Sequence, residues 1–303
     1  MGSDHSAVFH KHHFCCTACS IKEDMGDCSK QQVYVDLRAF DFSMGEFSTK
    51  AAEASAAVSQ IAFKAFDSSG EEAFSANQSS ADTGFGALEF ELTPGSYTFV
   101  AVGNKLSASA GADAMVSISS PASASLPEAL PTDVFSLAQS VTIEPRKAFT
   151  TAMTLPRVMS QFKLSTLDVL PSNVATLELI GNAEVPAVGS SAGSGSAGAS
   201  FDPSDGRLLT DQRWTKTANV SASAGKQKVN ITLNMLLSSD EQTIDVLVNA
   251  YDADGALVTT LSLNDVPMRR NRVTTARGTL FNAGGSSSFT FENDWLELYE
   301  IKF

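Results

Sequence analysis

Apolar and polar residues alternate in several short stretches of the chain, and this period of two is typical of strands with one buried face. The alternation begins near Gln32, in the stretch QVYVDLRAFDF. It is clearest in LEFELTPGSYTFVAVGN, where alternating runs flank Pro94 and Gly95. Proline presets φ and glycine accepts a positive φ, so this pair predicts a type II turn inside a β-hairpin.

Two similar turns lie about 185 residues apart. KAFDSSG (64–70) and NAYDADG (249–255) each follow an apolar run, and each places an Asp three residues before a Gly. We interpret both as tight turns between strands. A calcium loop around Asp252 and Asp254 is the alternative, but too few ligands follow in the required register. One copy in each half predicts two domains of similar build.

The chain is therefore expected to be all-β, with two tandem β-sandwich domains after a short N-terminal segment. The predicted divisions are a signal and tether segment at 1–28, a first sandwich at 29–157 and a second sandwich at 158–303. Residues 48–60 are the one stretch that suggests a short helix.

Two excursions rich in small residues interrupt the predicted domains. They are SSPASASLPEALP (119–131) and PAVGSSAGSGSAGASFDPSDG (186–206). Glycine, serine and alanine bury little apolar surface, so both segments are predicted to be loops, and the second a mobile one.

Composition and charge exclude several classes of function. Net charge is −13 over 303 residues, which argues against a nucleic-acid partner and against charge-driven docking on anionic lipid. Every histidine and cysteine lies within the first 28 residues, so the body has no Ser-His or Cys-His nucleophile and no imidazole base. A hydrolase with paired carboxylates survives this filter, but no motif singles out a pair. We therefore expect no enzyme activity and no cofactor.

The cysteines form a cluster, CCTACSIKEDMGDC, at 15–28. A disulfide framework would staple only the segment itself. Cys16, Cys19, Cys28 and His13 resemble part of a zinc site, although their spacing fits no standard finger or ribbon. The third interpretation is a bacterial lipoprotein signal, in which small residues precede Cys19 and acyl chains on that cysteine anchor the protein to a bilayer. The apolar run before Cys19 is interrupted by charged and histidine residues.

Several of these stretches resemble one known family. CSIKEDMGDC before an alternating strand, SQIAFKAFDSSG, LTPGSYTFVAVGN and DVPMRRNRVTTARGTLF with FENDW are similar to FimB/Mfa-type fimbrial anchor lipoproteins of Bacteroidales. The resemblance implies two transthyretin-like β-sandwiches, a lipid on Cys19, and a surface-exposed place on the outer membrane as part of a fimbrium. It implies that Lys22, Glu23 and Asp24 form the export signal, and that the partners are other fimbrial subunits bound by strand exchange.

The family includes anchors and polymerising subunits, and the latter are cut after an arginine ahead of the body. Here the first arginine, Arg38, falls within the alternating strand, where a paired backbone resists proteolysis. This favours an anchor over a polymerising or tip subunit. A surface glycan-binding lipoprotein is a further alternative. Such a protein needs exposed aromatic platforms, and only Trp214, Trp295 and four tyrosines are available.

Two further segments carry candidate function. RRNRVTTARG places Arg269, Arg270, Arg272 and Arg277 within nine positions. We interpret it as a strand, bulged near Gly278, whose arginines face an acidic surface; an anion-binding patch is the alternative.

The C-terminal stretch WLELYEIKF alternates apolar Tyr299, Ile301 and Phe303 with charged residues. It is either the last strand of the second domain or a strand donated to the first pilin.

Overall fold

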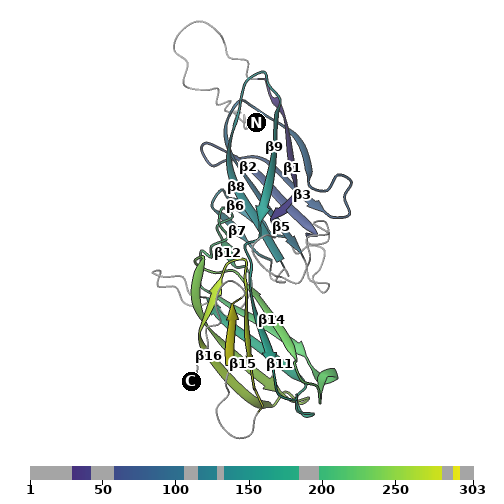
Figure 1. Cartoon of the computed structure of the whole chain (residues 1–303). Coiled ribbons are helices and arrows are strands. Elements are labelled where there is room, and N and C mark those ends of the chain that lie inside the picture. Colours follow the sequence, from purple (N-terminus) through teal and green to yellow (C-terminus); the bar gives the residue numbers. More distant parts are fainter. Residues whose placement is uncertain are drawn as a thin grey trace, which may run out of the picture.

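The computed structural model describes residues 29–41, 58–105, 115–127, 133–183, 198–281 and 289–293. Two β-sandwiches follow one another along an elongated molecule (Figure 1). In the described ranges the helical content is a 3₁₀ turn, Ser221–Ser223, and no described helix is long and apolar enough to cross a membrane. The all-β prediction is confirmed. Residues 48–57 of the suggested helix fall outside the description, and Gln60 already belongs to a strand.

The first sandwich consists of two sheets. Sheet 1 has the order β4-β1-β9, and sheet 2 has the order β3-β2-β5-β8. The strands are β1 (Gln31–Asp41), β2 (Gln60–Asp67), β3 (Glu72–Ser79), β4 (Ala87–Leu92), β5 (Gly95–Lys105), β8 (Asp133–Ile143) and β9 (Phe149–Pro156).

Alternation places the apolar residues of these strands between the two sheets. In β4, for example, Leu88, Phe90 and Leu92 are buried and the residues between them are exposed. The inward side chains of both sheets form one apolar cluster. Phe63 and Phe99 are at its centre, with ring centroids 5.4 Å apart in an edge-on arrangement. This burial is what holds sheet 1 on sheet 2.

The second sandwich repeats this topology strand for strand. Sheet 4 has the order β14-β10-β17-β18 and sheet 5 has the order β13-β11-β15-β16. The strands are β10 (Ser160–Thr166), β11 (Thr176–Ala183), β13 (Gln212–Asn219), β14 (Asn230–Met235), β15 (Glu241–Tyr251), β16 (Leu257–Arg269), β17 (Val273–Gly278) and β18 (Phe289–Asn293). In chain order β10, β11, β13, β14, β15, β16 and β17 correspond to β1, β2, β3, β4, β5, β8 and β9, and β18 is an addition.

The two similar turns are real, but they lie on non-equivalent hairpins. Asp67 and Asp252 each accept backbone N–H bonds from residues two and four positions later, and Gly70 and Gly255 have φ values of 85° and 81°. The first turn joins β2 to β3, whereas the second joins β15 to β16. The two domains have the same topology, but these turns do not occupy equivalent positions in it. They have the same local conformation only.

The predicted hairpin around Pro94 is wrong. β4 pairs with β1 in sheet 1, while β5 pairs with β2 and β8 in sheet 2, so the chain crosses between layers here. Gly95 is not among the residues with positive φ, so no type II turn forms. Alternation identifies the buried face of a strand but not its neighbour, and that is why the prediction failed.

The two excursions rich in small residues contain strands where the structure describes them; their residues 128–131 and 186–197 lie outside the described ranges, so the loop prediction is not tested there. β6 (Ser117–Ser120), β7 (Ser123–Ser125) and β12 (Ser200–Phe201) form sheet 3, in the order β12-β7-β6. Ala124 and Phe201 are fully buried. Sheet 3 thus covers the second face of sheet 2, and its apolar residues join the core of the second sandwich. The domain boundary after Arg157 stays a prediction, since sheet 3 has strands from both sides of it.

The loop after β12 packs closely on the start of the second sandwich. Gly206 has a φ of 75°, and its N–H donates to the carbonyl of Asp202 at 2.7 Å. A Cβ atom at Gly206 would overlap the side chain of Val158. Glycine is therefore needed here both for backbone conformation and for space.

We predict that Gly206→Ala lowers the free energy of unfolding by more than Gly225→Ala does. Gly225 has the same φ of 75° but open space around its Cβ position, so its substitution adds only left-handed strain of about 1–2 kcal/mol. Gly206→Ala adds overpacking against Val158, about 1–3 kcal/mol more. Urea unfolding of both variants measures the difference, and equal losses would contradict close packing of this loop.

Candidate assembly site

β1 is the central strand of sheet 1. It pairs antiparallel with β4 and parallel with β9. Its inward residues Val33, Val35 and Leu37 are at most 3% exposed. Burying each such side chain stabilises the fold by about 1.5–3 kcal/mol. A chain without β1 would therefore expose a strip of apolar core and two unpaired strand edges.

Arg38 lies at an irregularity in β1, where the register with β9 shifts between Asp36 and Ala39. Its guanidinium donates to both carboxylate oxygens of Asp36, at 2.9 and 2.6 Å, and this bonding lowers the pKa of Asp36. The Arg38 side chain is 65% exposed, so it is more accessible than a paired strand suggests. The backbone on either side is held: the N–H of Leu37 donates to the carbonyl of Gly86, and Ala39 pairs with β9. The paired strand that the sequence predicted around Arg38 is present, and resistance to proteolysis at this arginine stays a prediction.

The arginine-rich segment is a turn between sheets, not the single strand that the sequence predicted. β16 ends at Arg269 in sheet 5, and β17 begins at Val273 in sheet 4. Asn271 has a φ of 56° in this turn, a left-handed conformation that asparagine tolerates better than most residues. The pairing of β17 with β10 and β18 shows no register shift, so the bulge expected near Gly278 is not present.

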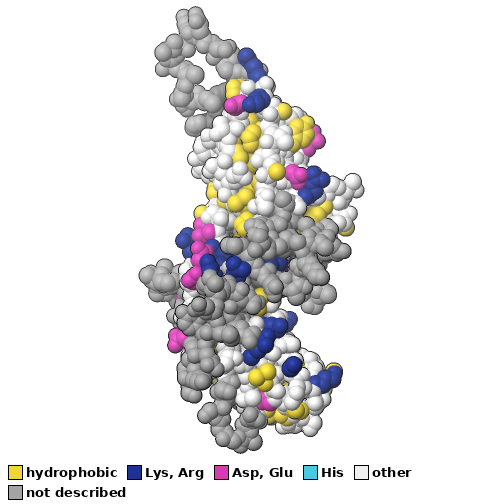
Figure 2. Space-filling view, viewed as in Figure 1, with side chains coloured by type: hydrophobic (Ala, Val, Ile, Leu, Met, Phe, Trp, Pro, Cys, Tyr) yellow, Lys and Arg dark blue, Asp and Glu magenta, His cyan; other side chains and the backbone are white. Residues whose placement is uncertain are grey.

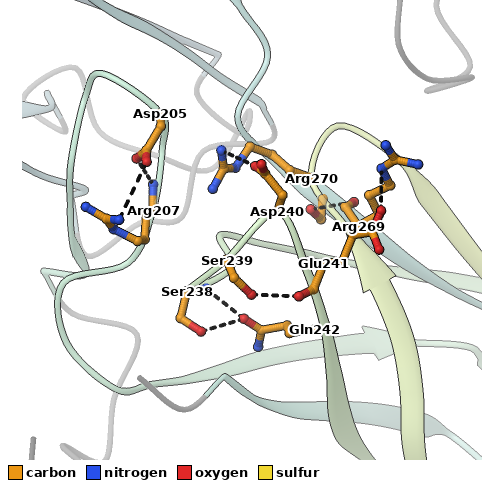
Figure 3. A network of polar contacts seen from close by, with 10 residues as sticks. Asp205, Arg207, Ser238, Ser239, Asp240, Glu241, Gln242, Arg269 and Arg270 are labelled. Atoms are coloured by element: carbon orange, nitrogen blue, oxygen red, sulfur yellow. Dashed lines mark hydrogen bonds and ion pairs between the residues drawn. The ribbon is translucent and has the colours of Figure 1, made fainter. Parts of the chain in front are cut away.

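Two of these arginines pair with acidic residues that precede or begin β15. Figure 3 shows Arg270 against Asp240, at 2.5 Å, and Arg269 against Glu241, at 3.3 Å. Arg270 also donates its backbone N–H to the carbonyl of Asp240. The acidic partners that the sequence interpretation required are thus present for Arg269 and Arg270, which favours a structural role over anion binding.

A buried ion pair lies where the two sandwiches meet. The Arg157 Nε atom is 2.9 Å from both carboxylate oxygens of Asp133, and Arg157 Nη2 is 2.7 Å from Asp133 Oδ2. Their side chains are 1% and 11% exposed. Arg157 also lies over the ring of Phe135, 5.3 Å from its centroid. Burial raises the pKa of Asp133, and the Arg157 guanidinium opposes that shift.

This pair escaped the sequence reasoning. Arg157 follows β9 and Asp133 begins β8, so the two strands and the turn between them separate the two residues along the chain. Sequence offers no signal for such a contact, because charged residues are common next to strand ends. Figure 2 shows that Lys, Arg, Asp and Glu side chains also gather on the surface near the level of the junction.

A polar pocket of about 360 Å³ opens beside β15 and β16. It is lined by Asn182, Ser238, Ser239, Gln242, Thr243, Ile244, Asp245 and Asp265. Asp265 has a φ of 53°, and its N–H donates to Asp245 Oδ1. The pocket lining includes no aromatic residue. Trp214 is fully buried opposite Gly181, so it is not an exposed platform for a sugar ring.

The remaining predicted site residues lie outside the described ranges and stay predictions. They are Cys19, Lys22, Glu23, Asp24, Tyr299, Ile301 and Phe303. Trp295 and the alternative zinc ligands are outside as well. Within the described residues, no group of three or more His, Cys, Asp or Glu side chains could hold a metal ion.

Strand order and core define the class: an all-β protein of two β-sandwiches with the same topology, joined by a small third sheet. Residues 87–300 match the model of a family described as "Family of unknown function (DUF6562)", and the chain belongs to that family. The search of curated proteins found no match.

Three solved structures share the fold. A "putative adhesin" from Bacteroides ovatus is 15% identical, covers 88% of this chain and 96% of its own, and has a TM-score of 0.54. The structure titled "putative polysaccharide binding proteins (DUF1812)" from Bacteroides thetaiotaomicron is 13% identical, covers 90% of this chain and 98% of its own, and has a TM-score of 0.55. The fimbrial anchor protein Mfa2 from Porphyromonas gingivalis is 12% identical, covers 90% of this chain and 100% of its own, and has a TM-score of 0.51. At these identities the likeness shows the fold, and it confirms the structural part of the resemblance seen in the sequence.

We predict that Asp133→Asn destabilises the protein strongly, because it removes the carboxylate that pairs with the buried Arg157 guanidinium. Breaking such a pair costs about 3–5 kcal/mol. The double variant Asp133→Asn/Arg157→Met should be more stable than Asp133→Asn alone, since it also removes the buried guanidinium. Denaturant unfolding of the single and double variants measures the coupling; additive effects would show that the pair does not act as a unit.

Proposed function

We propose that this chain is a non-enzymatic pilus component of the cell surface, and that it is the lipid-anchored subunit that tethers a pilus to the outer membrane. Its fold is shared with Mfa2, which is named a fimbrial anchor protein, and with a protein described as an adhesin. Other fimbrial subunits are its partners, reached by strand exchange, and a lipid on Cys19 is its link to the membrane.

The observation that carries the anchor role is the position of β1. No arginine lies between Cys19 and β1, and the first arginine of the chain is Arg38 within β1 itself. Pairing with β4 and β9 holds β1 on both sides. A subunit that keeps β1 keeps its covalent connection to Cys19, and so it stays attached to the membrane. Release of β1 would instead make it a polymerising or tip subunit.

A surface glycan-binding lipoprotein is a second candidate, favoured by the pocket beside β15. Hydroxyl, amide and carboxylate groups line it, and such groups exchange hydrogen bonds with sugar hydroxyls. The burial of Trp214 counts against this role, since stacking on an exposed aromatic ring is lost. Binding of the purified protein on a glycan array, abolished by Asp245→Ala, would promote this candidate over the anchor.

We predict that Cys19 carries the lipid. In a Bacteroidales host and with a complete signal peptide, the protein should take up an alkynyl fatty acid and fractionate with the outer membrane. Cys19→Ala should lose the label, whereas Cys16→Ala, a neighbouring cysteine that the anchor does not use, should keep it. Equal labelling of the wild type and Cys19→Ala would rule out this anchor, and stoichiometric zinc in the purified protein would favour the metal site instead.

We also predict that the C-terminal stretch is donated to the first pilin. Deleting residues 299–303 should leave the melting temperature nearly unchanged, yet pili should be shed into the medium. At about 3.3 Å per residue, the nine residues 295–303 span about 30 Å, enough to cross a sandwich. The pair Ile301→Asp/Phe303→Asp should reproduce the loss, because it changes the apolar face of the stretch.

The control for this prediction is Glu300→Ala/Lys302→Ala, which changes the opposite, charged face and should retain pili. If the deletion unfolds the second sandwich, the stretch is an ordinary final strand. If the deletion leaves pili attached, donation does not occur.

A further inference from the structure

The two sandwiches differ at one sheet edge. In the second, β17 is paired on both sides, in parallel with β10 and antiparallel with β18. In the first, the equivalent strand β9 pairs with β1 alone among the residues that the structure describes. The far edge of β9 therefore corresponds to the edge of β17 that β18 covers.

The equivalence rests on strand direction as well as order. β1 runs antiparallel to β4 and parallel to β9, and β10 runs antiparallel to β14 and parallel to β17. The added strand β18 pairs over five residues of β17, from Thr274 to Gly278. It brings Phe289 and Phe291 into the core, where they are 4% and 2% exposed. The second sandwich thus shows what kind of segment completes this edge: a short antiparallel strand with two apolar side chains at alternate positions.

The chemistry of β9 suits an incoming strand. FTTAMTLP contains no charged residue, whereas charged side chains are a common protection of sheet edges. The edge strand β4 in the same sheet carries Glu89 and Glu91. In β9, Pro156 lacks an N–H, so pairing is expected to end before it. That leaves seven residues, about 23 Å of edge.

The side chains of β9 are buried to different degrees along the strand. Met153 and Leu155 are buried, whereas Phe149 at the start of the strand is partly buried and packs edge-on against Phe99, with ring centroids 6.2 Å apart. Figure 1 shows β9 and β1 side by side on one face of the upper sandwich. In Figure 2 that face is mostly uncharged.

We propose that the edge of β9 that faces away from β1 accepts an antiparallel strand from another polypeptide, while β1 stays in place. The incoming strand presents two apolar side chains at alternate positions to the first core, as β18 does in the second. Main-chain hydrogen bonds give affinity and the alternate side chains give selectivity. That the incoming strand belongs to a fimbrial subunit rests on the proposed function; the acceptor edge itself does not.

Hydrogen exchange of the full chain tests the proposal, with a synthetic peptide of residues 287–293, SSFTFEN, as the probe. In the free chain, the β9 amides that do not face β1 should exchange faster than those of β17, which is covered on both sides. Saturating peptide should slow these β9 amides by about tenfold or more and leave β17 unchanged. A peptide with both phenylalanines replaced by aspartate should have no effect.

Matched variants locate the effect. Ala152→Glu/Thr154→Glu adds like charges on the exposed face of β9 against Glu292 of the peptide, so protection should be lost. Ser140→Glu/Thr142→Glu makes the same change at exposed positions of β8 and should keep protection. The proposal is overturned if β9 is already as protected as β17 in the free chain, if the peptide leaves β9 exchange unchanged, or if protection appears at β17 instead.

An experiment on cells, in which attached and released pili are measured, separates this inference from the proposed function. Ala152→Glu/Thr154→Glu should release pili from cells that still display the protein, while the β8 pair should not. If cells with the wild-type chain hold no pili, the fimbrial role fails even though the peptide result stands. If the peptide result is negative while wild-type cells hold pili, the acceptor edge fails alone.

Discussion

The first sandwich depends on the pairing of β1 on both of its edges. A buried strand with unpaired N–H and C=O groups is costly, so the central strand of a three-stranded sheet fixes both of its neighbours. Because Val33, Val35 and Leu37 also fill the core, β1 connects sheet 1 to sheet 2. The second sandwich meets the same demand with β10, and it adds β18 at the edge where β9, in the described part of the chain, has no partner strand.

The two sandwiches are joined by more than a linker. Sheet 3 pairs β12 of the second half with β7 of the first, and the Ser125 and Ser200 hydroxyl groups are hydrogen-bonded at 3.1 Å. The Asp133–Arg157 ion pair is buried at the junction of the two sandwiches. The N–H of Val158 donates to the carbonyl of Val134 beside it. In the proposed anchor role, these hydrogen bonds and the buried ion pair would connect the two sandwiches under the tension of a pilus.

Sequence alone predicted the class of the fold and the faces of the strands, because burial imposes a period of two on each strand. The sequence did not predict which strands pair with one another. The runs on either side of Pro94 look like a hairpin yet belong to different sheets, since alternation carries no information about which edge a strand joins. The serine- and alanine-rich segments looked like loops because small residues bury little area each, but parts of both segments pair in sheet 3 and bury Ala124 and Phe201.

The sequence predicted less about the candidate sites than about the fold. The contact of Arg157 with Asp133 and the pocket beside β15 arise from residues that only the tertiary structure brings together. Arg269 and Arg270 were predicted to face acidic partners and do so, but the left-handed Asn271 that turns the chain between them and β17 left no pattern in the residue types.

The central claim is that the mature protein keeps β1 covalently joined to its N-terminal anchor. Intact-mass and N-terminal peptide analysis of the protein taken from the outer membrane of its host tests this most directly. The account predicts a chain that begins at an acylated Cys19 and continues without interruption through Arg38 into Ala39. A mature chain that begins at Ala39 would show that β1 is removed, and the protein would then be a polymerising subunit rather than an anchor.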